Sequence, residues 1–222
     1  VVVSVVHVMK GGFTGERYLD GRSVDKITAF LFHRGDHTDP ARLAANEGKS
    51  FQGSIVLGMG FTFDDTDTKG VATPISEMER LLTQCPNNRE VVFPYMGGEE
   101  LNDHPAHAHH RYIINFFDRN EQECWQKWPT LMEIVKAKVK PERDGQKRKA
   151  LRERWWQYAE KRPGLHTAID GLERVLVISR VGQHAAFAFL PAGMVYSEAL
   201  IVFPFSSKSA FCTLQSRPHE IW

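Results

Sequence analysis

Lysines and arginines gather between residues 136 and 162, and two adjacent tryptophans lie among them. The segment, KAKVKPERDGQKRKALRERWWQYAEKR, contains eleven Lys or Arg and four Asp or Glu. Its net charge is therefore +7, whereas the whole chain carries only +1 and the other 195 residues sum to −6. Charge polarised in this way favours a polyanionic partner. The alternative is a solvated charged helix without a partner.

Eight cations of this segment are spread over a loop and two helical turns, so their side chains can reach phosphate groups. They are Lys138, Lys140, Arg143, Lys147, Arg148, Lys149, Arg152 and Arg154. Trp155 and Trp156 are adjacent, so on a helix they point about 100° apart. We expect one of them in the core, and the other either on a sugar, beside the arginines or also packed.

Four polar residues near the C-terminal strands could read base edges. Arg pairs with guanine and Gln with adenine, and the candidates are Arg180, Gln183, His184 and Ser197. Ordinary surface turns contain the same residue types. A second polar cluster, His104 to His110, could suggest a metal, but closed zinc sites usually need Cys or acidic partners at defined spacing. We expect exposed histidines near an anionic ligand there, and no metal.

No complete catalytic centre is evident in the chain. The glycines between Gly53 and Gly60 lack the Lys-Ser or Lys-Thr ending of a phosphate loop and the strand-GxGxxG-helix context of a dinucleotide site. We interpret them as turn or bulge positions. GxSxG, HExxH and paired-carboxylate patterns are also missing from the sequence.

Composition indicates a globular protein with a sizeable core, since 42% of its 222 residues are hydrophobic. No stretch approaches 18 apolar residues, so no membrane segment is predicted. Three cysteines without CxxC spacing predict neither a disulfide framework nor a zinc ribbon and fit a reducing, cytoplasmic setting. Because the chain starts in strand-like sequence without Met, we expect an excised piece of a larger protein.

Hydrophobic spacing and capping residues predict an α+β fold of mixed sheets with surrounding helices, because helices and strands do not alternate strictly. The expected helices cover residues 23–33 (capped by Ser23), 73–85, 120–135 (capped by Asn120 with Glu123 and split at Pro129), 147–161, 165–172 and 208–215. The expected strands cover residues 1–8, 91–95 and 111–117, a β-like stretch covers 51–63, and three more follow Arg174.

Several short motifs occur in a fixed order along almost the whole chain. They are Asn46-Glu47-Gly48, Phe51-Gln52-Gly53-Ser54, Gly58-Met59-Gly60-Phe61, residues 92–101 (VFPYMGGEEL), residues 112–116 (YIINF), residues 139–143 (VKPER), Trp155-Trp156 and residues 214–222 (LQSRPHEIW). In this order they resemble the target-recognition region of large single-chain DNA methyltransferases and restriction-modification enzymes of the MmeI-like type II kind.

The resemblance implies that residues 1–45 are the end of a methyltransferase core or a connecting region, and that residues 46–222 are a DNA target-recognition domain. Such enzymes bind S-adenosylmethionine, flip an adenine out of the duplex and methylate its amino group. Their Asn-Pro-Pro-aromatic motif is missing from this chain, so we expect catalysis and the cofactor in the parent enzyme only. The implied partners are double-stranded DNA and an upstream methyltransferase core of the same polypeptide.

Two other functions remain open on the sequence. One is a protein-interaction domain whose basic helix docks on an acidic partner, which the charge of the segment would serve equally well. The other is an intact small-molecule enzyme, which would need a polar constellation that the sequence does not contain.

Overall fold

The chain divides into two compact units, Val1–Ala45 and Asn46–Trp222. The structure, a computed structural model, describes residues 10–28, 30–35, 43–182 and 184–221. The division falls between Ala45 and Asn46, and the domains and roles expected from the sequence stay predictions. The strand predicted over residues 1–8 lies outside the described residues.

The first unit contains a two-stranded antiparallel hairpin. Strand β1 (Arg17–Leu19) pairs with β2 (Arg22–Val24), and Tyr18 lies opposite Ser23. Asp20 and Gly21 join the strands, both with positive φ (50° and 75°), which is the conformation of tight hairpin turns with the right twist. The predicted helix from Ser23 to His33 is therefore wrong. Ser23 and Val24 belong to β2, and none of the described residues from Asp25 to His33 is helical.

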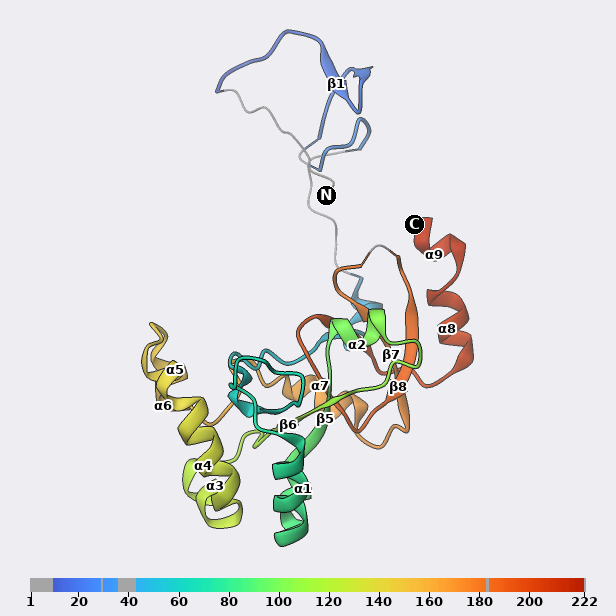
Figure 1. Ribbon diagram of the computed structural model, residues 1–222. Helices are drawn as coiled ribbons and strands as arrows, with labels where there is room; N and C mark the ends of the chain where they lie inside the picture. The colour runs from blue at the N-terminus through green and yellow to red at the C-terminus, as the bar shows by residue number, and fades with distance from the viewer. Residues whose placement is uncertain (1–9, 29, 36–42, 183, 222) are drawn as a thin grey trace. The chain divides into compact units, whose positions relative to one another are not determined.

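Two four-stranded sheets form the centre of the second unit (Figure 1). One has the order β3-β10-β7-β8, with all neighbours antiparallel. The other has the order β4-β6-β5-β9, in which β5 and β9 are parallel. The strands are β3 (Phe51–Gln52), β4 (Thr62–Phe63), β5 (Val92–Met96), β6 (Arg111–Ile114), β7 (Arg174–Ser179), β8 (Phe187–Pro191), β9 (Val195–Tyr196) and β10 (Leu200–Phe203).

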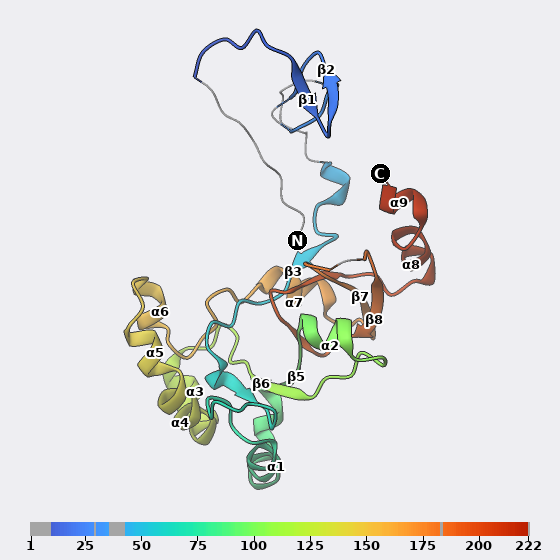
Figure 2. The ribbon, with the colours of Figure 1, turned by 45° about the horizontal axis from the view of Figure 1, so that its top comes forward.

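Helices flank these sheets on two sides. The views in Figures 1 and 2 agree that α3 to α6 lie to one side of the sheets and α8 and α9 to the other. The α-helices are α1 (Ile75–Gln84), α2 (Gly98–Asp103), α3 (Glu121–Lys127), α4 (Pro129–Lys138), α5 (Lys140–Asp144), α6 (Lys149–Glu153), α7 (Pro163–Ile169), α8 (Lys208–Leu214) and α9 (Arg217–Ile221); short 3-10 turns are η1 (Ala44–Asn46), η2 (Met59–Phe61) and η3 (Pro86–Glu90). The predicted α+β class is confirmed.

Local signals placed several helix ends correctly. Asn120 Oδ1 accepts a hydrogen bond from the Glu123 backbone at 2.8 Å and caps α3. Pro129 begins α4 directly after α3 has ended, because proline is tolerated in the first turn of a helix but not in its interior. Pro74 likewise precedes α1.

The long helix predicted over residues 147–161 is wrong, since only the short α6 forms there. The chain leaves helical geometry at Arg154. Trp155 and Trp156 are both buried, with exposed fractions of 5% and 7%, and their rings meet edge to face. A continuous helix would have pointed one of them away from the core, so burying both stabilises the break. Neither ring is available to a sugar.

The second unit contains two hydrophobic clusters. The larger packs α1, α3 and α4 against the sheet of β4, β5 and β6, and it includes Trp128 and both tryptophans of the basic segment. The smaller packs α2 and α7 against β7, β8 and β10. The strands therefore hold a helical arm, α3 to α6, which contains most of the basic segment, on a rigid base.

Gly53 lies where the backbones of the two sheets are in close contact. A Cβ at Gly53 would lie 2.1 Å from the Ser197 backbone oxygen, whereas one at Gly193 would meet nothing within 4 Å. We expect Gly53→Ala to destabilise the fold by about 3 kcal/mol, because backbone cannot move aside cheaply. Gly193→Ala, the matched control, should change stability by less than about 1 kcal/mol. Urea denaturation measures both, and equal midpoints would contradict the packing described here.

Candidate functional site

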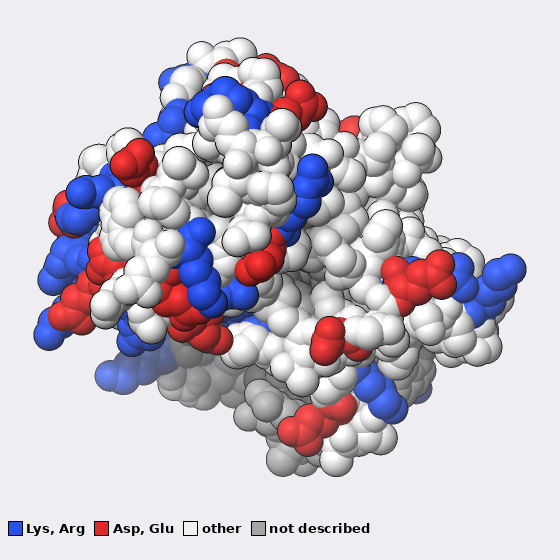
Figure 3. All heavy atoms as spheres, turned by 90° about the horizontal axis from the view of Figure 1, so that it is seen from below, with Lys and Arg blue, Asp and Glu red and all other residues white. Residues whose placement is uncertain are grey.

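The basic segment contains two kinds of cations, which differ in what their side chains contact. Some are turned inward and hold the fold together, and others lie in solvent. Figure 3 shows Lys and Arg intermixed with Asp and Glu on the face of the helical arm that is seen from below, so this face is not continuously basic. The geometry of each cation decides whether it is free to bind a ligand.

Arg143 is completely buried, with an exposed fraction of 0%. Its Nη2 donates to the backbone oxygen of Val56 at 2.7 Å and to that of Gln157 at 3.4 Å. Burial lowers the pKa of Arg143, while nearby Glu142 raises it. The prediction that Arg143 binds phosphate is corrected, because its guanidinium does not reach the surface.

Lys138 and Lys140 are also engaged within the protein. Lys138 Nζ donates to the backbone oxygens of Gly70, Val71 and Ala72 at 3.3, 2.9 and 2.8 Å. Lys140 Nζ forms an ion pair with Asp144 at 2.7 Å, one turn along α5. A phosphate would have to displace three backbone partners of Lys138, so we do not retain Lys138 as a phosphate contact. The ion pair of Lys140 is partly exposed and contributes little, so phosphate binding by Lys140 stays a prediction.

Residues 147–154, the outer corner of the arm, contain five exposed cations: Lys147, Arg148, Lys149, Arg152 and Arg154. In the part of the chain that the structure describes, the side chains of Lys147, Arg148 and Arg154 have no hydrogen bond or ion pair. Lys149 makes only a solvent-exposed pair with Glu153 at 3.3 Å, which contributes little. Arg152 Nη1 donates to the backbone oxygens of Gln146 and Lys147 and fixes the turn before α6.

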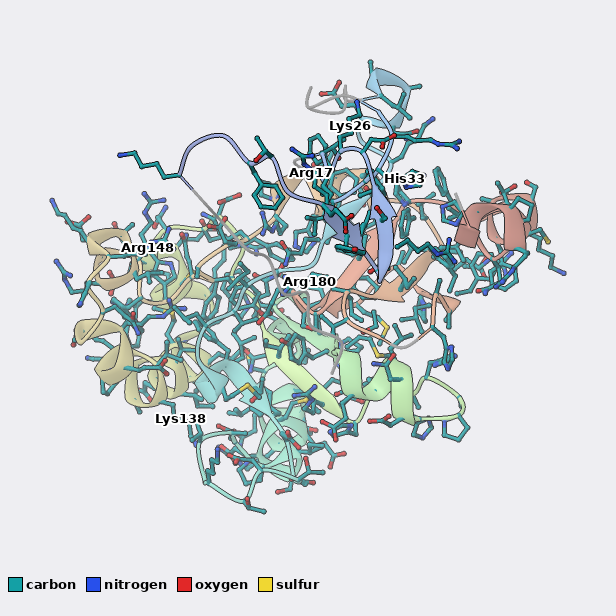
Figure 4. The ribbon with its side chains drawn as sticks, turned by 90° about the horizontal axis from the view of Figure 1, so that it is seen from above. Arg17, Lys26, His33, Lys138, Arg148 and Arg180 are labelled. Carbon is teal, nitrogen blue, oxygen red and sulfur yellow. The ribbon has the colours of Figure 1, made fainter. Side chains whose placement is uncertain are left out.

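The base-reading candidates lie on a different part of the unit. Arg180 follows β7 and is exposed, and His184 is exposed in the connection to β8. Gln183 lies outside the described residues. Figure 4 places Arg180 among the strands and Arg148 at the edge of the helical arm. A small ligand therefore cannot touch both, whereas an extended polymer can.

Ser197 is buried, with an exposed fraction of 6%. Its hydroxyl hydrogen-bonds to the Tyr95 side chain, whose pKa rises to about 12, chiefly because of burial. It also accepts from the Ala199 backbone at 3.3 Å. The prediction that Ser197 reads a base is corrected, because the meeting of the two sheets at Gly53 covers it.

One histidine of the cluster lies beside a buried ion pair. Glu100, 2% exposed, pairs with Arg111 at 2.6 Å and lies 3.5 Å from His110. Glu100 Oε2 also accepts from the Gly97 backbone at 3.0 Å and caps α2. Among the described residues no group of three His, Cys, Asp or Glu is arranged to hold a metal. His107 Nδ1 lies 2.8 Å from the backbone oxygen of Leu101 in α2.

One feature that the sequence interpretation missed is the turn at residues 57–59, at the start of η2, where two apolar side chains are exposed to solvent. Leu57 and Met59 are 40% and 42% exposed. The glycines around them suggested only turns, but Leu57 itself has φ 52°, a conformation that leucine rarely adopts. The signal available in the sequence was a glycine-rich motif with apolar residues between its glycines.

Comparisons with known proteins show a related fold. No family model matches the chain, and neither does any curated protein sequence. The structure is similar to that of the Type IIL restriction-modification enzyme MmeI in complex with DNA, with a TM-score of 0.59 and 16% sequence identity. The match covers 90% of this chain and 25% of the MmeI chain. This chain thus corresponds to about a quarter of that enzyme.

Membrane insertion has no candidate segment in the described part of the chain, since none of its helices is both long and apolar enough to cross a bilayer.

Lys138 should act as a clamp on the loop that contains Gly70 to Ala72. Lys138→Met removes three hydrogen bonds to backbone oxygens, so we expect faster tryptic cleavage after the exposed Lys69. Lys149→Met, which loses only an exposed pair, is the control and should cleave like the parent. Mass spectrometry of a limited digest measures the rate. An unchanged rate in Lys138→Met would show that the clamp is dispensable.

Proposed function

We propose that the second unit binds duplex DNA and reads its sequence, as the target-recognition part of an S-adenosylmethionine-dependent adenine-specific DNA methyltransferase or restriction-modification enzyme. The observation that carries the proposal is the outer corner, where five exposed cations occupy eight residues. Three of these cations have no hydrogen bond or ion pair with any residue that the structure describes. When such cations neutralise phosphates, the counterions condensed on the DNA are released, which favours binding.

The fold supports the same proposal. The neighbour of similar fold is a restriction-modification enzyme in complex with DNA, and almost all of this chain takes part in the match. The separation of the corner from Arg180 (Figure 4) also suits a long ligand. Phosphate contacts at the corner would position the duplex, and base contacts near β7 would choose the sequence.

Only the motif resemblance supports a role for S-adenosylmethionine and for a methyltransferase core. The core would flip the base and transfer the methyl group, and this chain would bind the duplex and recognise its sequence. A protein partner with an acidic surface is the competing function for the corner. Its binding would also weaken in salt, so the discriminating ligand is DNA itself.

Neutralising the corner should weaken binding to every duplex. We expect Lys147→Ala with Arg148→Ala to lower affinity irrespective of sequence and to reduce the slope of log K against log salt by about 1.8, which is about 0.9 for each lost phosphate contact. Fluorescence anisotropy with a random 30-base-pair duplex at several salt concentrations measures both quantities.

The matched control removes two exposed cations elsewhere in the same unit. Arg89→Ala with Lys208→Ala makes the same change in net charge, outside residues 136–162. The proposal expects an unchanged salt slope for this control. A slope that falls equally in both double variants, or a parent chain that binds no duplex, would contradict it.

Arg180 should influence which sequence is bound. We expect Arg180→Ala to lose about tenfold or more of the discrimination at one base-pair position, with little change in the salt slope. Selection from a random duplex library, followed by sequencing, measures the preference. Enrichment of one and the same sequence by the variant and by the parent would remove Arg180 from the readout.

A further inference from the structure

Leu57, Gly58 and Met59 form a strained and exposed tip, which we call the apolar tip. Leu57 has φ 52° and Gly58 has φ 121°. A left-handed leucine is an outlier that persists only where the surrounding structure holds it. The residues on either side are core residues, since Val56 and Phe61 are 5% and 0% exposed. The chain thus leaves the core for three residues and returns.

Backbone contacts fix the loop on both sides of the apolar tip. On the N-terminal side, Ile55 exchanges two backbone hydrogen bonds with Glu160, at 3.0 and 3.1 Å, and the Val56 oxygen accepts from buried Arg143. On the C-terminal side, Thr62 Oγ1 donates to the Met59 oxygen at 2.6 Å. The apolar tip is therefore held rigidly as well as exposed.

The elements that hold the apolar tip belong mainly to the basic segment. Gly60 packs so closely on Lys138 that a Cβ would lie 2.8 Å from its side chain. Phe61 packs edge to face on Tyr158. Arg143, in α5, lies directly before the turn that leads to the outer corner. A rigid connection therefore runs from the five exposed cations to the two exposed apolar side chains.

The exposed carboxylate of Glu142 influences which part of a DNA ligand can lie against the apolar tip. Its Oε2 would lie 3.2 Å from a Cβ at Gly58, so a carboxylate borders the apolar tip. A carboxylate repels phosphate but accepts hydrogen bonds from amino groups on base edges. The surroundings thus disfavour the DNA backbone at this point and favour the bases.

We propose that Leu57 and Met59 form a wedge that enters the base stack of a duplex held by the outer corner. The inference rests on the proposed function and names a second contact that the cations alone would not make. Rigid apolar side chains that insert between base steps unstack them and kink the duplex. The strain at Leu57 is then compensated by the contacts of the basic segment, which keep the side chain extended before DNA arrives.

A duplex that is already unstacked spares the wedge this cost, because unpaired bases separate more easily than paired ones. The test compares two random-sequence 30-base-pair duplexes, one intact and one with a central two-base mismatch, by fluorescence anisotropy. We expect the parent chain to prefer the mismatched duplex by about tenfold. Leu57→Gly should reduce that preference to less than about twofold and leave the salt slope unchanged.

Leu57→Gly also separates the wedge from a structural role. Glycine adopts φ 52° without strain, so the Tm should not fall. Leu57→Asn provides a second variant, because asparagine tolerates this conformation but is polar. Leu31→Gly is the matched control, since Leu31 has φ 60° and is 41% exposed in the other unit, and it should keep the full preference.

Three results would overturn the wedge. They are equal binding of both duplexes by the parent chain, an undiminished preference in Leu57→Gly or in Leu57→Asn, and an equal loss in Leu31→Gly. Salt-dependent binding of intact duplex in any of these cases would leave the proposed function standing. A parent chain that binds neither duplex would refute both proposals together.

Discussion

The hydrogen bond from the buried guanidinium of Arg143 to the Val56 oxygen joins the basic segment to the rest of the second unit. Burying this guanidinium costs free energy of folding, because its Nε and Nη1 are buried without a partner in the described structure. Burial of a poorly paired charge costs several kcal/mol. A fold keeps such a group where it fixes a conformation, and here the conformation is that of the loop leading to Leu57.

Charge in this segment therefore has two uses that composition cannot separate. The inner cations, Lys138 and Arg143, bind backbone oxygens of two different loops. The outer ones, from Lys147 to Arg154, remain in solvent. A net charge of +7 overstates the cations available to a ligand, yet the inner ones make the outer ones effective by holding the arm rigid. The proposed interface is thus smaller than the segment and better defined.

Features set by neighbouring residues were predictable from the sequence, and features set by distant contacts were not. The cap at Asn120 and the break at Pro129 depend on residues within one turn. The burial of Arg143 depends on Val56, 87 positions away, and that of Ser197 depends on the absence of a side chain at Gly53. The helix predicted from Ser23 does not form, because the chain turns back at Asp20-Gly21 and Ser23 pairs with Tyr18 in a hairpin.

Hydrogen–deuterium exchange of the chain, with and without a 30-base-pair duplex, tests the central claim most directly. The claim is that the outer corner and the apolar tip form one DNA-binding surface, connected through Arg143. It predicts slower exchange on binding at residues 146–154 and 56–60 together. Slower exchange confined to α8 and α9 (Lys208–Ile221), or no change anywhere, would contradict it.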